Sequence, residues 1–168
     1  MWWKALLLLA GIGLLLFLAL IACLRREQHV RLGGEIVSDD FGFAVLEHRT
    51  EAKIGDAVPR GTFHVVRLDV RNHAKRVDYA LDAHRPVLFD ERGGHYEVSP
   101  EGQRALDAQS ADRPARTSIA PGESYASDLV FDVPSGTNAL WLKISWGGPL
   151  IDLAELIVFG DRDIALEP

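Results

Sequence analysis

The residues from Thr62 to Asn72 constrain the fold more than any other part of the sequence, because apolar residues recur there at every second position. One face of this stretch carries His64, Val66, Leu68 and Val70. The other face carries Phe63, Val65, Arg67, Asp69 and Arg71. Successive side chains of a β-strand point to opposite faces, so the pattern predicts a half-buried antiparallel strand whose apolar face lies against a core.

Similar short segments recur along the chain and are separated by turn residues. The predicted strands are residues 35–38, 41–48, 77–83, 86–89, 95–98, 124–133, 139–146 and 156–159. With residues 62–72 they make about seven to nine strands in roughly 130 residues. We therefore expect an all-β fold, an immunoglobulin-like antiparallel β-sandwich, although the Cys–Trp–Cys core of true immunoglobulin domains is absent. Residues 99–118 interrupt the pattern and predict a long surface loop with a helical turn at residues 101–108.

The N-terminal residues 5–24 form an uncharged, mostly apolar run of 20 residues. As a helix, this run would span the ~30 Å hydrocarbon core of a bilayer. Three interpretations remain open: an uncleaved signal anchor, which the length favours; a lipoprotein signal, in which Cys23 is acylated; and an ordinary cleaved signal peptide. The expected organisation is a signal anchor or transmembrane helix over residues 1–24, a tether over residues 25–32 and the sandwich over residues 33–168.

The charge and the cysteine content exclude several functional classes. The formal net charge is −6 at pH 7, so the chain lacks the basic stripe that nucleic-acid binding requires. Cys23 is the only cysteine, and it lies in the apolar run. The rest of the chain therefore has no disulfide and no cysteine-based metal site. We expect no nucleic-acid partner.

The six histidines lack the spacing of a known metal motif. They are His29, His48, His64, His73, His84 and His95. None forms H-x-x-x-H or pairs with a cysteine, and His64 is expected to be a hydrogen-bonded histidine of the core or its rim. The sequence also has no calcium-binding loop, no G-x-S-x-G elbow and no phosphate-binding loop. We therefore predict no catalytic residue, no metal site and no cofactor, and expect that the protein is not an enzyme.

Four residues are candidates for contact with a protein partner. Trp141 falls on the polar face of its strand, with Lys143 beside it. Tryptophan is enriched at the centres of protein interfaces, so Trp141 either meets a partner or lies beneath another part of the fold. Arg104 and Arg113 belong to the predicted loop of residues 99–118. They complete the set, because long loops often carry function.

Four motifs follow one another in a characteristic order. They are Val70-Arg71-Asn72, the Val-Leu-Phe-Asp-x-x-Gly-Gly-x-Tyr segment of residues 87–96, Pro121-Gly122-Glu123-Ser124, and the Leu-Val-Phe-Asp-Val-Pro segment of residues 129–134. In this order the chain resembles domain-of-unknown-function family 4352 over roughly residues 33–159. The resemblance implies an immunoglobulin-like domain of a bacterial lipoprotein or membrane-anchored protein, and it brings no catalytic residues with it.

These observations predict a non-catalytic binding or accessory module at the cell envelope, with a protein partner that the sequence does not identify. Arg25 and Arg26 alone would favour a cytoplasmic domain under the positive-inside rule. The expected location, on the extracytoplasmic side of the cytoplasmic membrane, therefore depends on the resemblance. The alternative is a periplasmic metal-binding or chaperone-like protein that uses its histidines.

Overall fold

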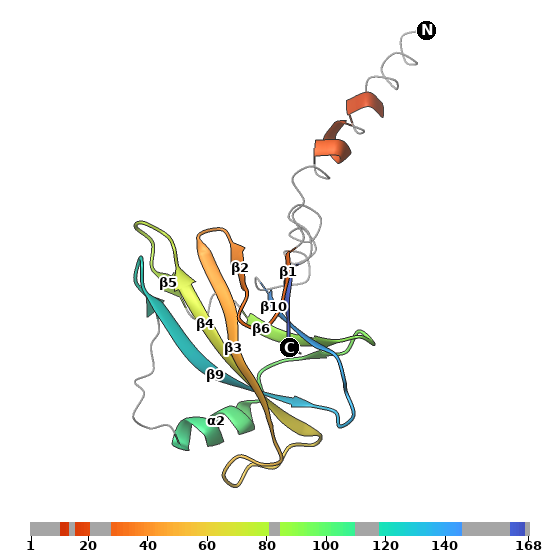
Figure 1. Cartoon of the computed structure of the whole chain (residues 1–168), viewed down its shortest axis with the longest axis vertical. Coiled ribbons are helices and arrows are strands. Elements are labelled where there is room, and N and C mark those ends of the chain that lie inside the picture. Colours follow the sequence, from red (N-terminus) through yellow and green to blue (C-terminus); the bar gives the residue numbers. More distant parts are fainter. Residues whose placement is uncertain are drawn as a thin grey trace.

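The computed structural model describes residues 11–13, 16–20, 28–80, 85–109, 118–145 and 162–166. Its strands form two sheets that face each other in a sandwich, with one helix on the outer side of one sheet (Figure 1). A further small antiparallel pair joins β5 (Tyr79–Ala80) to β8 (Ser118–Ile119). The prediction of an all-β sandwich is confirmed.

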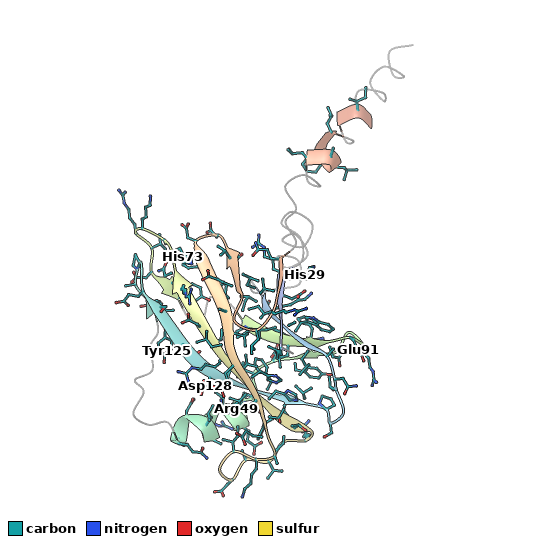
Figure 2. The ribbon with its side chains drawn as sticks, viewed as in Figure 1. His29, Arg49, His73, Glu91, Tyr125 and Asp128 are labelled. Atoms are coloured by element: carbon teal, nitrogen blue, oxygen red, sulfur yellow. The ribbon has the colours of Figure 1, made fainter. Side chains whose placement is uncertain are left out.

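The four-stranded sheet has the order β2-β3-β4-β9 and is antiparallel throughout. Its strands are β2 (Glu35–Ser38), β3 (Phe41–Glu51), β4 (Thr62–Asn72) and β9 (Ser124–Val133). All four coincide with or extend predicted segments, because alternation of apolar residues is a local signature of a half-buried strand. Arg49 on β3 and Asp128 on β9, both labelled in Figure 2, lie on the outer face of this sheet.

The five-stranded sheet has the order β1-β11-β10-β6-β7. Its strands are β1 (Gln28–Val30), β11 (Arg162–Ala165), β10 (Leu140–Ser145), β6 (Arg85–Asp90) and β7 (His95–Tyr96). The sequence does not predict β1 or β11, and their pairing is parallel, which corrects the expectation of an antiparallel sandwich at this edge.

The segment predicted as a tether, residues 25–32, therefore includes the strand β1. Besides its pairing with β11, this strand makes side-chain contacts with the domain. Val30 packs against the main core, and the side-chain amide of Gln28 accepts a hydrogen bond from the backbone N–H of Val37 at 3.1 Å. Both contacts are with residues that are distant in the sequence, so the charged residues of this short segment do not predict a strand.

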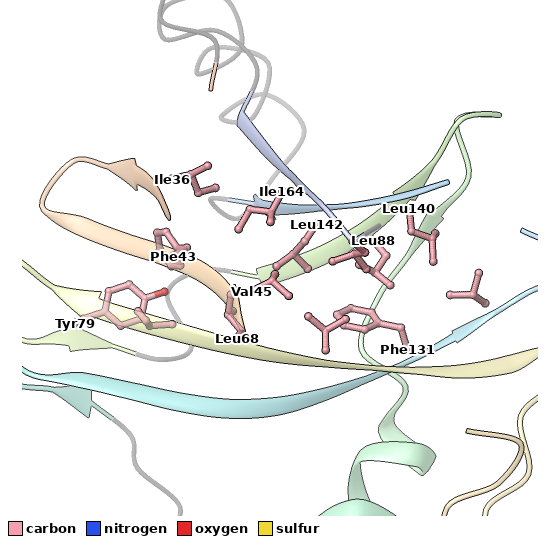
Figure 3. Packing of buried hydrophobic residues seen from close by; sticks show 14 of the residues in the cluster. Ile36, Phe43, Val45, Leu68, Tyr79, Leu88, Phe131, Leu140, Leu142 and Ile164 are labelled. Carbon is pink, nitrogen blue, oxygen red and sulfur yellow. The ribbon is translucent and has the colours of Figure 1, made fainter. Parts of the chain in front are cut away.

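The main core fills the space between the two sheets. Val45 and Leu68 of the four-stranded sheet meet Leu88 and Leu142 of the five-stranded sheet (Figure 3). All four side chains are at most 4% exposed. Burying a side chain of this size stabilises a fold by roughly 1.5–3 kcal/mol, so this layer is the main source of stability.

A second, smaller cluster lies on the outer side of the four-stranded sheet, beneath helix α2 (Pro100–Gln109). Phe63 and Val65 are buried there, and Leu106 of the helix packs against them. The helical turn predicted at residues 101–108 is confirmed and extends to the ten residues of α2. The prediction of a surface loop is wrong for these residues, because the helix packs on the sheet. The sequence does carry a helix-start signal, since the Ser99 hydroxyl accepts a hydrogen bond from the Gly102 N–H at 3.2 Å, with proline at the first helical position.

At the N-terminus, residues 11–13 and 16–20 are helical. The described helices include none with the length and apolar character needed to cross a membrane. Several predicted features lie outside the described residues: the rest of the apolar run with Cys23, residues 81–84 with His84, and the strand expected at residues 156–159.

Candidate functional site

Trp141 and Lys143 lie on the outer face of the five-stranded sheet, as the alternation of their strand predicts. Leu142 between them is fully buried in the core, so its two neighbours point away from the core. The register pairs Trp141 with Phe89 and Lys143 with Val87. Directly paired residues of an antiparallel sheet share a face, so side chains from β10 and β6 lie together on this surface.

Phe89 lies close to both Lys143 and His95 on this surface. Lys143 Nζ lies 5.2 Å from the centroid of the Phe89 ring, within the range of a cation–π contact. His95 pairs with Phe89 across β6 and β7, and the two ring centroids are 6.2 Å apart. Arg85 begins β6 on the same face and is exposed. We call Arg85, Phe89, His95, Trp141 and Lys143 the aromatic–basic face.

At the far edge of the same sheet, the Nδ1 atom of His29 lies 2.9 Å from Oδ2 of Asp163. Asp163 is 8% exposed and belongs to β11, so this carboxylate is a buried strand residue. It is the acidic residue that the described strands place on this outer face. Because it is buried and engaged with His29, the charged side chains that the described strands bring to the surface of the aromatic–basic face, Arg85 and Lys143, are basic.

The outer face of the four-stranded sheet has a different character, because its charged residues contact one another. Arg49 lies between 3.5 and 3.7 Å from the carboxylates of Glu47, Glu51 and Asp128. Arg71 contacts Asp69 at 2.9 Å. Exposed ion pairs of this kind contribute little stability each, about 0–1 kcal/mol. In these contacts four carboxylates face two arginines, so the formal charge of the group is −2.

Arg104 and Arg113, the other two candidate contact residues, do not join the aromatic–basic face. Arg104 is exposed on α2, and α2 packs on the outer side of β9. The structure therefore places Arg104 on the opposite side of the sandwich from Trp141 and Lys143. Arg113 lies outside the described residues.

Two of the histidines contact each other. The Nε2 atom of His48 on β3 lies 2.9 Å from Nδ1 of His64 on β4. His64 is 8% exposed, which confirms the prediction of a hydrogen-bonded core or rim histidine. Burial, followed by the charge of His48, lowers the pKa of His64 to about 4. Across the described ranges, no group of three or more histidine, cysteine or acidic side chains is arranged to hold a metal ion.

Asn72 ends the Val-Arg-Asn motif, and its structural role is clear. It is 1% exposed. Its Nδ2 donates to the carbonyls of Val77 and Ile119 at 2.8 and 2.9 Å, and its Oδ1 accepts from the Ala74 N–H at 2.9 Å. This side chain therefore ties the end of β4 to the next loop and to β8. The role is in folding and not in chemistry.

The motif of residues 87–96 is likewise a turn signature. Asp90 accepts hydrogen bonds from the Tyr96 hydroxyl at 2.7 Å and from the N–H groups of Gly94 and Arg92 at 2.7 and 2.9 Å. These bonds, with that from Tyr96 the largest, hold the pKa of Asp90 below its usual value. Gly93 has a φ of +81°, a conformation that glycine adopts readily.

Comparison with known proteins identifies the family of the chain and solved structures with a similar fold. A family model described as a domain of unknown function, DUF4352, matches residues 32–151. A conserved hypothetical protein from Bacillus anthracis superposes with a TM-score of 0.56 at 15% identity, over 71% of this chain and 92% of the other. The secreted protein MPT63 from Mycobacterium tuberculosis superposes with a TM-score of 0.53 at 17% identity, over 85% and 98%. No curated protein sequence matches. At these identities the two structures support the sandwich fold alone.

Proposed function

The chain belongs to the domain-of-unknown-function family DUF4352, and from that premise we propose that it is a non-catalytic binding module of the cell envelope. In this proposal an N-terminal apolar helix anchors an immunoglobulin-like sandwich at the extracytoplasmic side of the cytoplasmic membrane. The aromatic–basic face of the five-stranded sheet is the contact surface, and its partner is a protein segment that carries carboxylates. The observation that carries the proposal is the gathering of aromatic and basic side chains on this face.

Exposed apolar side chains support the anchor. In the described N-terminal turns, large apolar side chains are between 47% and 67% exposed: Ile12, Leu16, Phe17, Leu18 and Leu20. Soluble domains rarely expose apolar residues in such a contiguous group, and a bilayer would bury them. The uncharged run of residues 5–24 supports the same interpretation. Among similar structures, the mycobacterial protein is described as secreted.

The contrast between the two outer faces supports the choice of surface. The outer face of the four-stranded sheet is partly covered by α2, and four carboxylates on it face two arginines, Arg49 and Arg71. On the aromatic–basic face, Lys143 and Arg85 add positive charge to a chain whose net charge is −6. Opposite charges steer association and select partners, so this face suits an acidic segment. Trp141 and Phe89 offer the aromatic area on which binding energy concentrates.

The location is tested by intact-mass analysis of the membrane-extracted protein together with protease digestion of spheroplasts. An unmodified full-length mass with digestion of the domain is the expected result. A mass that begins at an acylated Cys23 would replace the helix anchor with a lipid anchor. A full-length protein that resists digestion in spheroplasts but not in lysed cells would refute the extracytoplasmic placement.

The surface is tested by photo-crosslinking in intact cells. A photoreactive phenylalanine analogue replaces Phe89 on the aromatic–basic face and, as a matched control, Arg104 on the opposite side. We expect a discrete crosslinked product from position 89 that is weakened by Lys143→Glu. Equal products from both positions, or a product that Lys143→Glu does not change, would refute this choice of surface.

A further inference from the structure

The histidine pair of β3 and β4 has a specific geometry. The two nitrogens, His48 Nε2 and His64 Nδ1, are 2.9 Å apart, and the ring planes are inclined by only 17°. The ring centroids are 5.1 Å apart, 2.2 Å more than the nitrogens. That difference is about twice the distance from an imidazole nitrogen to its ring centre. The two rings therefore lie nearly in one plane, and each nitrogen points along its ring plane directly at the other.

The surroundings of the two rings differ. His64 faces the inside of the sandwich, pairs with Phe131 of β9 in the register and is 8% exposed. His48 is only partly buried, so it connects the pair to solvent. One imidazole of this site is therefore buried in the sandwich, and the other is partly exposed to solvent.

We propose that the two nitrogens, His48 Nε2 and His64 Nδ1, form a two-coordinate site for a monovalent d10 cation, copper(I) in the cell and silver(I) as its laboratory probe. Imidazole nitrogens are good copper ligands. Two donors that point at each other satisfy an ion with linear coordination. Zinc sites, in contrast, need three or four donors, and the described residues bring no third histidine, cysteine or acidic ligand to this pair. This site goes beyond the proposed binding function and does not depend on it.

The protons balance without any release. In the metal-free pair, one of the two facing nitrogens carries a hydrogen and donates it to the other. When the cation binds, both facing nitrogens must present lone pairs. Each neutral ring then carries its hydrogen on the nitrogen that faces away from the ion, which is Nδ1 in His48 and Nε2 in His64. The site gains one positive charge, and a monovalent ion carries less charge into this buried position than a divalent one.

The fit requires a small movement. Metal–imidazole bonds are about 2 Å long, so a linear ion needs the nitrogens about 4 Å apart, roughly 1 Å more than in the metal-free pair. His48 can supply this movement, because its side chain is only partly buried, whereas His64 is held in the core. The pair is therefore an asymmetric site with one fixed ligand and one adjustable ligand.

The test is a silver nitrate titration of the full-length chain in detergent and chloride-free buffer at pH 7.5. The chain carries Cys23→Ser to remove the competing thiol. Calorimetry is expected to show one ion per chain with a dissociation constant below about 1 µM. His48→Gln is expected to weaken binding by about tenfold or more. His95→Gln, an exposed histidine of the aromatic–basic face, is the matched control and should leave the affinity unchanged.

Nitrogen NMR of the parent protein keeps the test decisive even if a variant misfolds. Silver should shift the signals of His48 Nε2 and His64 Nδ1 and leave those of His73 and His95 in place. A competition titration with copper(I) and a colorimetric chelator should show the same loss of affinity in His48→Gln. The absence of silver binding, or binding that leaves the two nitrogen signals unmoved, would overturn the proposal.

Discussion

Replacing Asn72 is the sharpest test of how this fold is held together. In Asn72→Ala, the carbonyls of Val77 and Ile119 and the N–H of Ala74 lose a partner that is 1% exposed in the parent. A typical hydrogen bond contributes about 1 kcal/mol, and a buried group left without a partner costs about 1–3 kcal/mol. Three such groups, with partial access of water to the loop, predict a loss of about 3 kcal/mol in the free energy of unfolding.

The assay is urea unfolding of the full-length chain in mild detergent, followed by tryptophan fluorescence and far-ultraviolet circular dichroism. Asn138→Ala is the matched control, because Asn138 is exposed, and its effect should stay within about 0.5 kcal/mol. A loss below about 1 kcal/mol in Asn72→Ala would refute the argument that this side chain ties β4 to β8. So would an equal loss in both variants.

Three further predictions concern the histidine pair and the helix. The pKa of His64 is about 4 in the folded protein and 6.5 in the unfolded protein, so the unfolded state binds the proton first as the pH falls. The metal-free protein should therefore lose up to about 3 kcal/mol of its free energy of unfolding between pH 6.5 and 4. The urea concentration at the unfolding midpoint should fall across that pH range in the parent and should fall less in His64→Gln. Gln103→Ala removes the amide that donates to the Asp128 carbonyl and accepts from the Val130 N–H, both at 3.0 Å, and should destabilise by about 1–2 kcal/mol in the same assay. Gly102→Val should lift α2 from its sheet, since a Cβ there would lie 2.6 Å from Val130, and hydrogen exchange of the helix amides should then accelerate.

The long strands of the four-stranded sheet and the strand of Trp141 could be predicted from the sequence, because their apolar residues alternate locally. The pairing of β1 with β11 could not, since parallel neighbours distant in sequence leave no local pattern. The contact of His48 with His64 could not be predicted either, because it depends on the register of β3 against β4. Helix α2 is a different case. The sequence predicts a helical turn at residues 101–108, but its weak apolar pattern does not reveal that the helix packs on the sheet.

The surface around Trp141 could likewise be predicted only in part. The alternation of its strand predicts that Trp141 and Lys143 share a face. Only the pairing of β10 with β6 and β7 adds Phe89 and His95 to that face. The separation of Arg104 from them follows from the docking of α2 on the other sheet, which the sequence does not reveal.

The affinity of the crosslinked partner segment, made as a synthetic peptide, tests the central claim most directly. The peptide should bind the full-length chain, and Lys143→Glu should weaken it by at least about tenfold, while Arg104→Glu on the opposite side leaves the affinity unchanged. Equal affinity for the parent and Lys143→Glu, or an equal loss in both variants, would contradict a binding function located on the aromatic–basic face.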